Sequence, residues 1–121
     1  MFRLTPLEAL LVSHFIMDWI FQWNWMAMNK SKKWTPLCVH CLVYTLGFIP
    51  AFYFLGMNFL WLTVIFLSHV LLDQRKFELW LMEKFKRCKK EEMPESLWTV
   101  VLIGLDQVLH IAILAAIVLF S

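Results

Sequence analysis

The sequence contains few charged residues. Asp, Glu, Lys and Arg make up 17% of its 121 residues, whereas hydrophobic residues make up 61% and the mean hydropathy is +0.68. A soluble domain has about a quarter charged residues and about half apolar residues. The composition therefore excludes an ordinary soluble domain and indicates an integral-membrane protein.

Cysteine is also scarce, and the three cysteines do not form a disulfide framework. Cys38 and Cys41 lie in an apolar stretch, and Cys88 lies in a strongly basic segment typical of a cytoplasmic loop, where thiols stay reduced. Two thiols without a second cysteine pair do not make a zinc site, and their order around His40 does not match haem attachment. We interpret Cys38 and Cys41 as packing residues.

The N-terminal apolar stretch lacks the small-residue cleavage site of a secretory signal peptide. It is interrupted by His14 and Asp18 and ends in the run QWNW at residues 22–25. We therefore expect it to remain in the protein as the first membrane span. The chain has no long internal repeat and no room for a separate soluble domain.

Four apolar stretches are each close to the ~20 residues that cross a bilayer as a helix. They cover residues 6–26, 36–55, 57–74 and 96–120. This pattern predicts an all-α protein, an integral-membrane four-helix bundle that forms a single domain over residues 1–121.

Local signals predict where these helices begin and bend. Thr5 and Glu8 have the spacing of a capping box, and Pro6 occupies the first helical position, so the first helix should begin there. Pro50, about one turn after Gly47, predicts a kink in the second span.

The basic residues predict the orientation. Ten of the 11 Lys and Arg residues lie in two loops, at residues 30–33 and 75–90. With four spans these loops share one side, which the positive-inside rule places in the cytoplasm. We expect a multi-pass protein of the inner membrane with both termini outside. Because topology explains these residues, the net charge of +2 does not indicate nucleic-acid binding.

Residues 75–93 differ from the spans because apolar and charged residues alternate there at helical spacing. This pattern predicts a basic amphipathic helix between the third and fourth spans, lying on the cytoplasmic leaflet in contact with anionic lipid. A solvated loop helix, whose lysine stems cover its apolar side, is the alternative.

All three aspartates lie four residues from a histidine, inside the apolar stretches. The pairs are His14/Asp18, His69/Asp73 and Asp106/His110. Four residues is just over one turn, so each pair should lie on one face of its helix. At about 1.5 Å per residue, the first and last pairs lie at matching depths of antiparallel spans. Ionisable groups at membrane depth are costly and usually functional, which predicts a polar site in the cytoplasmic half.

Imidazole and carboxylate ligands favour Zn, Mn or Fe, and helical bundles build metal sites from such pairs. We predict that these six residues bind one or two divalent transition-metal ions. The candidate catalytic residues, which surround a metal-activated water, are Asp18, Asp106 and Gln22. The candidate substrate-binding residues at the mouth of the site are Lys30, Lys33, Arg75, Lys76 and His40. Gln74 and Gln107 are candidate orienting groups.

The opening of the chain also resembles a known family. The run LLVSHFIMDWIFQ at residues 10–22, followed by WMA at 25–27 and Lys30, resembles the start of a small bacterial and phage integral-membrane family of unknown function with an HxxxDWxxQ motif. More distantly, the His-x-x-x-Asp pairs resemble those of membrane-bound metal-dependent hydrolases. That second resemblance implies hydrolysis, and its matching positions are His14, Asp18, His69 and Asp73.

The leading hypothesis is a metal-dependent hydrolase that acts on a lipid or lipid-linked, phosphate-bearing substrate at the cytoplasmic leaflet. The basic residues at the mouth could bind phosphate as point charges. Three alternatives stay open: an oligomeric proton- or metal-coupled transporter, buried His–Asp hydrogen bonds that only hold helices together, and a structural or lysis-related phage membrane protein without a site. The sequence leaves the metal, the substrate and a possible homo-oligomer undecided.

Overall fold

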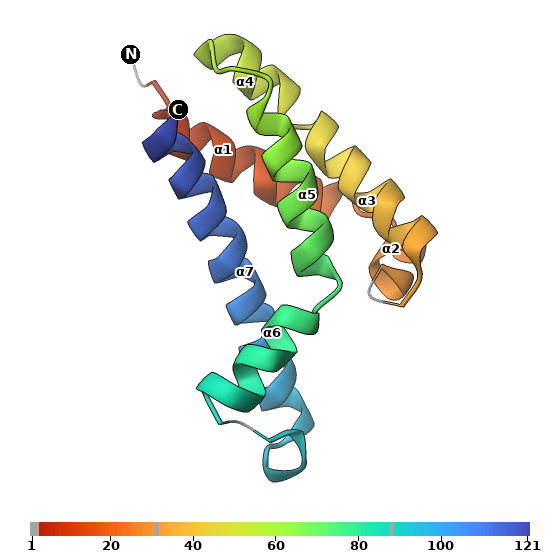
Figure 1. The fold of residues 1–121 in the computed structure, drawn as a ribbon. Coiled ribbons are helices and arrows are strands. Elements are labelled where there is room, and N and C mark those ends of the chain that lie inside the picture. Colours follow the sequence, from red (N-terminus) through yellow and green to blue (C-terminus); the bar gives the residue numbers. More distant parts are fainter. Residues whose placement is uncertain (1–2, 31, 88) are drawn as a thin grey trace.

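The computed structural model describes residues 3–30, 32–87 and 89–121, and all regular structure in these residues is helical (Figure 1). The elements in chain order are α1 (Pro6–Phe15), η1 (Ile16–Ile20), α2 (Asn24–Asn29), α3 (Trp34–Leu46), α4 (Ile49–Leu55), α5 (Trp61–Asp73), α6 (Lys76–Trp80), η2 (Leu81–Phe85), η3 (Lys90–Glu92) and α7 (Glu95–Phe120). η1 and η2 are π-helical, and η3 is a 3-10 turn. The all-α prediction is confirmed, and Cys88 lies outside the described residues.

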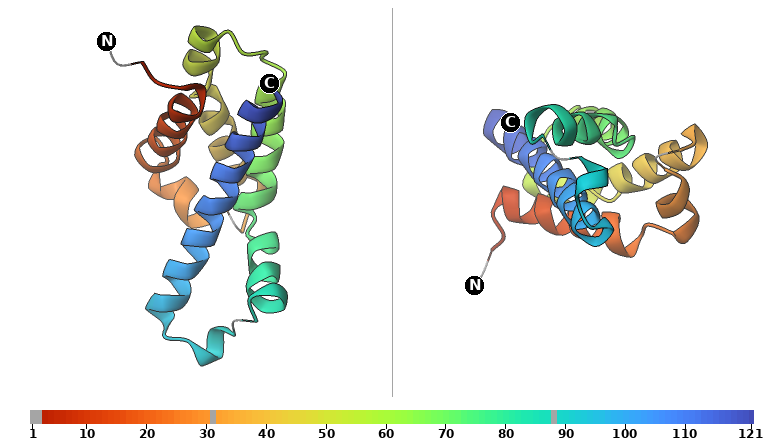
Figure 2. Two further views of the ribbon diagram at one scale, coloured as in Figure 1. Left: turned by 90° about the vertical axis from the view of Figure 1, so that its left-hand side faces the viewer. Right: turned by 90° about the horizontal axis from the view of Figure 1, so that it is seen from below.

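The helix α5 packs between α3 and α7, and α1 with η1 crosses them obliquely (Figure 1). The start of α1 and the end of α7 lie at the same end of the molecule. At the other end, α6 and the first part of α7 extend beyond the remaining helices (Figure 2). This arrangement brings segments far apart in the sequence into contact around α5.

Two helical segments are long and apolar enough to cross a membrane. One covers residues 34–55 and consists of α3 and α4, and the other is α7. α5 is a shorter apolar helix of 13 residues. The expected first span, residues 6–26, is divided among α1, η1 and α2, because the chain leaves the helix after Ile20 and Trp23 is extended where α2 begins.

The predicted local signals are present. Thr5 Oγ1 accepts a hydrogen bond from Glu8 N (3.2 Å), and Glu8 Oε2 accepts one from Thr5 N (2.7 Å), so α1 begins with a capping box. The kink predicted from Gly47 and Pro50 is confirmed, since α3 ends one residue before Gly47 and α4 begins with Pro50 in its first turn.

Gly47 also permits a close approach between helices. The Met17 side chain of η1 lies so near the Gly47 Cα that a Cβ atom at this position would overlap it. Glycine at the α3–α4 junction therefore lets η1 pack directly against the backbone there.

The bundle buries polar as well as apolar side chains. An apolar core lies towards the end that holds both termini, and it contains Leu10, Tyr44, Phe48, Phe52, Ile65, Leu114 and Ile117. The buried polar side chains are His14, Asp18, Lys30, His40, Thr45, His69, Asp73, Glu78, Asp106 and His110. The outer faces of the helices carry exposed apolar residues instead, such as Leu42, Leu67 and Val108. A polar group therefore lies inside the bundle, beside the apolar core.

Candidate metal centre

Four buried side chains from three helical segments converge on one point. Asp18 comes from η1, His40 from α3, and His69 and Asp73 from α5. Each offers one ligand atom, and the four atoms all lie within 4.8 Å of one another. None of the four residues is more than 5% exposed. We call this group the four-residue cluster.

Two of the distances within the four-residue cluster match those of atoms that share an ion, and the others differ by up to about 0.4 Å. Asp73 Oδ2 lies 2.9 Å from His40 Nε2 and 3.1 Å from His69 Nε2, and Asp18 Oδ1 lies 3.2 Å and 3.8 Å from the same two nitrogens. Two ligand atoms bound to one zinc ion at 2.0–2.1 Å are about 3–3.4 Å apart. The four-residue cluster could therefore hold a divalent metal ion.

These short contacts are not all hydrogen bonds. Asp18 Oδ1 is close to His40 Nε2, yet it has no correctly oriented hydrogen-bond partner in the part of the chain that the structure describes. An unpaired buried carboxylate oxygen costs free energy. A cation among the four atoms would remove that cost.

A second group adjoins the first and shares Asp73 with it. Asp73, Asp106 and His110 also offer ligand atoms within 4.8 Å of one another, and all three residues are buried. The Asp73 Oδ1 atom lies 3.4 Å from His110 Nε2. His110 Nδ1 lies 2.7 Å from the main-chain oxygen of Asp106, to which it donates a hydrogen bond.

His14, a predicted ligand, has other partners. Gln107 Nε2 points towards the carboxylates of Asp18 (3.3 Å) and Asp106 (3.4 Å), so Gln107 Oε1 accepts a hydrogen bond from His14 Nε2 (2.8 Å). The other His14 nitrogen, Nδ1, then accepts from the Tyr44 hydroxyl at 2.6 Å. Since both nitrogens are occupied, His14 lies outside the ligand groups. The π-turn of η1 separates it from Asp18.

Tyr44 was not anticipated from the sequence. Its ring stacks on the His69 imidazole with a centroid distance of 3.7 Å and an interplanar angle of 8°. It therefore supports His69 while its hydroxyl orients His14. A tyrosine that faces the interior of an apolar span needs a hydrogen-bond partner for its hydroxyl. This requirement could have identified Tyr44 as a site residue from the sequence.

The three candidate catalytic residues share one small polar cavity of about 80 Å³. It is lined by Asp18, Trp19, Gln22, Lys30, Arg75, Ile103, Asp106 and Gln107. Gln22 Nε2 donates to the main-chain oxygen of Asp18 at 3.2 Å. Two of the predicted substrate-binding residues, Lys30 and Arg75, thus lie beside the predicted catalytic ones.

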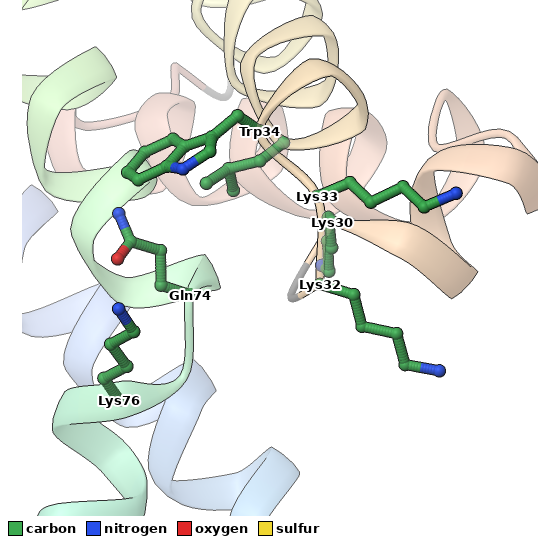
Figure 3. A pocket seen from close by; sticks show the side chains of 7 residues that line it. Lys30, Lys32, Lys33, Trp34, Gln74 and Lys76 are labelled. Carbon is green, nitrogen blue, oxygen red and sulfur yellow. The ribbon is translucent and has the colours of Figure 1, made fainter.

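The other predicted substrate-binding residues lie elsewhere. Lys33 and Lys76 line a separate pocket with Lys30, Lys32, Trp34, Leu37 and Gln74. In that pocket Lys76 points towards Gln74, whereas Lys33 points away from it (Figure 3). His40 belongs to the four-residue cluster. Lys30 lines both cavities, and its Nζ lies 3.1 Å from Asp73 Oδ2.

An apolar groove of about 420 Å³ lies next to the polar cavity. It is lined by Phe15, Ile16, Trp19, Ile20 and Gln107. Trp19 and Gln107 also line the polar cavity, so the two spaces adjoin. Gln107 contacts the carboxylates of Asp18 and Asp106 from this side.

Glu78 is a further buried acid that the sequence did not single out. It lies on α6 and is fully buried, and burial, together with the neighbouring Asp106, raises the pKa of its carboxyl to about 7. The turn before α6 passes through Arg75, which has a left-handed backbone conformation (φ 62°). That turn directs α6 back towards α7 and carries Glu78 inward. In the sequence Glu78 is one more charge in an amphipathic pattern.

A model of one protein family, described as Protein of unknown function (DUF3307), matches residues 7–121. No curated protein and no solved structure matches the chain. The match includes every residue of both ligand groups.

Proposed function

The chain belongs to a family of unknown function, DUF3307, and we propose that it is a membrane-embedded, metal-dependent hydrolase. The observation that carries this proposal is the convergence of two imidazoles and two carboxylates in the four-residue cluster. We propose that the cluster holds one divalent ion of Zn, Mn or Fe, the metals that suit nitrogen and oxygen ligands.

The exposed apolar helix faces and the buried polar side chains support a membrane location. We propose four spans, formed by α1 with η1, α3 with α4, α5, and α7. The lysine-rich segments around residues 30–33 and 75–90 then face the cytoplasm, and both termini face outward. Buried polar groups and exposed apolar helix faces are what a bilayer requires of a bundle.

The adjoining cavities support a lipid substrate. We propose that an apolar chain lies in the groove along Phe15, Ile16 and Ile20, and that a phosphate group enters the polar cavity beside Lys30 and Arg75. Lysine and arginine bind phosphate through charge-assisted hydrogen bonds. A lipid held in this way reaches the site from within the cytoplasmic leaflet.

The chemistry follows from the groups around the polar cavity. His40, His69, Asp18 and Asp73 would hold the divalent ion, whose chemistry would be to lower the pKa of water towards about 7 and so supply a nucleophile at neutral pH. In the hydrolysis that we propose, the water oxygen forms a bond to phosphorus, and the bond between phosphorus and the leaving oxygen breaks. One water proton passes to the leaving oxygen, and Asp18 and Asp106 line the cavity where a carboxylate could carry it. Gln22 would orient the substrate or the water.

Metal content and lipid hydrolysis test this proposal directly. Protein purified in detergent without chelator should contain transition metal, and His40→Ala and His69→Ala should lose it. His14→Ala is the matched control, since His14 is an equally buried histidine outside the ligand groups and should keep the ion. Retention of full metal content in both cluster variants would refute the ligand assignment. If wild-type protein holds metal but hydrolyses no phospholipid, the enzyme proposal fails while the metal site stands.

A proton or ion relay is the second candidate, and one observation favours it. Tyr44, His14, Gln107 and Asp18 form a continuous hydrogen-bonded chain that leads into the four-residue cluster. Such chains line transport paths through membranes. Flux in liposomes that is abolished by Gln107→Leu, in protein without hydrolytic activity, would favour this function over hydrolysis.

A further inference from the structure

We propose that the centre holds a second divalent ion, bound by Asp73, Asp106 and His110 and completed by Glu78. This inference rests on the proposed metal-dependent function and extends it from one ion to a pair. Paired ions about 3.5–4 Å apart, bridged by shared ligands, can stabilise both the attacking and the leaving oxygen in phosphoryl chemistry.

Asp73 has the geometry of a bridging ligand. Its Oδ2 atom faces His40 and His69 of the four-residue cluster, at 2.9 Å and 3.1 Å. Its Oδ1 atom faces His110 on the opposite side, at 3.4 Å from Nε2. One carboxylate therefore presents a different oxygen to each ligand group.

His110 is oriented to bind metal through Nε2. Its Nδ1 donates to the main-chain oxygen of Asp106, so in the neutral ring Nε2 carries the free lone pair. Nε2 is buried and has no hydrogen-bond partner among residues 3–30, 32–87 and 89–121. It faces a carboxylate oxygen of Asp73, and a lone pair facing a lone pair is repulsive unless a proton or a metal ion lies between them.

Asp106 and Glu78 supply two further oxygens. Asp106 Oδ1 and both carboxylate oxygens of Glu78 are buried and accept no hydrogen bond from a donor within the described residues. α6 packs against α7, which places the Glu78 carboxyl beside that of Asp106. Asp73, Asp106 and His110 offer ligand atoms within 4.8 Å of one another, and Glu78 would add oxygens to this set, which suits Mn or Fe as well as Zn.

The local charge also favours a bound cation. The interior contains four carboxyl groups, those of Asp18, Asp73, Asp106 and Glu78. Among the described lysine and arginine residues, only Lys30 is buried. Arg75 adds a partly exposed cation beside the polar cavity. Buried charges require partners or metal ions. Without a bound ion these carboxyl groups outnumber the two cations, and a divalent ion bound among them would offset the difference.

The experiment is a titration of metal-free protein with Mn²⁺ alone, read by bound stoichiometry and by electron paramagnetic resonance. Wild type should bind two equivalents and give the spectrum of a spin-coupled pair. Glu78→Gln and His110→Ala should each bind one equivalent and give the spectrum of an isolated ion. Glu83→Gln is the matched control, because Glu83 lies in the same segment with its side chain 69% exposed, and it should still bind two.

The outcomes separate this inference from the proposed function. A single equivalent in wild type that is lost in His40→Ala and unaffected by Glu78→Gln would overturn the second ion and leave the first intact. No binding in wild type would overturn both. If Glu78→Gln does not fold, His110→Ala tests the second ion instead. Removal of the His110 side chain leaves all four residues of the four-residue cluster in place.

Discussion

The Nε2 atoms of His40 and His69 lie 2.8 Å apart, and both lie within 3.1 Å of Asp73 Oδ2. Two ring nitrogens at this distance can share only one proton. A purely structural hydrogen bond would pair one donor with one acceptor and would not need a third atom at the same point. The two imidazoles and this carboxylate could thus face one cation.

Removal of metal should destabilise the protein. A ligand that binds only the folded state stabilises it by about 2.7 kcal/mol at a concentration 100 times its Kd. We expect a chelator to lower the unfolding temperature in detergent and added Zn²⁺ or Mn²⁺ to restore it. His40→Ala, which lacks a ligand of the four-residue cluster, should show smaller changes. Equal unfolding temperatures for wild type with and without chelator would contradict a bound ion.

His14 should contribute to stability and not to metal affinity. His14→Ala leaves the Tyr44 hydroxyl and Gln107 Oε1 without their partner. Each unsatisfied buried polar group costs about 1–3 kcal/mol, so the variant should unfold at a lower temperature. Thermal unfolding and metal analysis of the same sample check both parts. If His14→Ala loses the ion and keeps its stability, His14 is a metal ligand and not a stabilising residue.

Gly47→Ala should destabilise the protein because the added Cβ overlaps the Met17 side chain. Overpacking of this kind costs typically about 1–3 kcal/mol. Met17→Ala in the same chain should recover part of the loss, which a double-mutant cycle measures. Gly104→Ala is the control, because no atom lies within 4 Å of a Cβ there and alanine favours a helix. Additive effects of Gly47→Ala and Met17→Ala would exclude the contact as the cause.

Lys30 and Arg75 should bind the phosphate of the substrate. Hydrogen bonds to charged groups contribute about 1.5–3 kcal/mol, so Lys30→Met and Arg75→Met should each lower kcat/KM for a phospholipid at least about tenfold. Lys84→Met serves as the comparison, because the Lys84 side chain is 62% exposed and lies away from both cavities. Steady-state hydrolysis of lipid in mixed micelles provides the measurement. A similar loss in all three variants would indicate a general effect of surface charge.

The apolar groove should select for a lipid chain. Ile16→Trp narrows the groove, so it should lower kcat/KM for a long-chain phospholipid more than for a water-soluble short-chain analogue. Leu67→Trp, at an exposed position on α5, should affect neither substrate. Equal effects of Ile16→Trp on both substrates would show that the lipid chain does not bind in this groove.

The sequence by itself determined the local features of this protein. The capping box at Thr5 and the break at Gly47 and Pro50 were predicted because they depend on residues close together in the chain. The Asp–His pairs inside apolar stretches predicted a buried polar site, because the two members of each pair are only four residues apart on one helix. His69, Asp73, Asp106 and His110 all lie in the two groups of buried side chains that could hold a metal ion.

Only the tertiary structure decided which further side chains complete the centre. Asp18, on η1, lies in the four-residue cluster, whereas His14, on α1, is hydrogen-bonded to Tyr44 and Gln107. The position of α3 brings in His40, and the left-handed turn at Arg75 brings in Glu78. Helix rotation and chain reversal depend on packing between distant segments, so a pattern of residue types along the chain does not specify them.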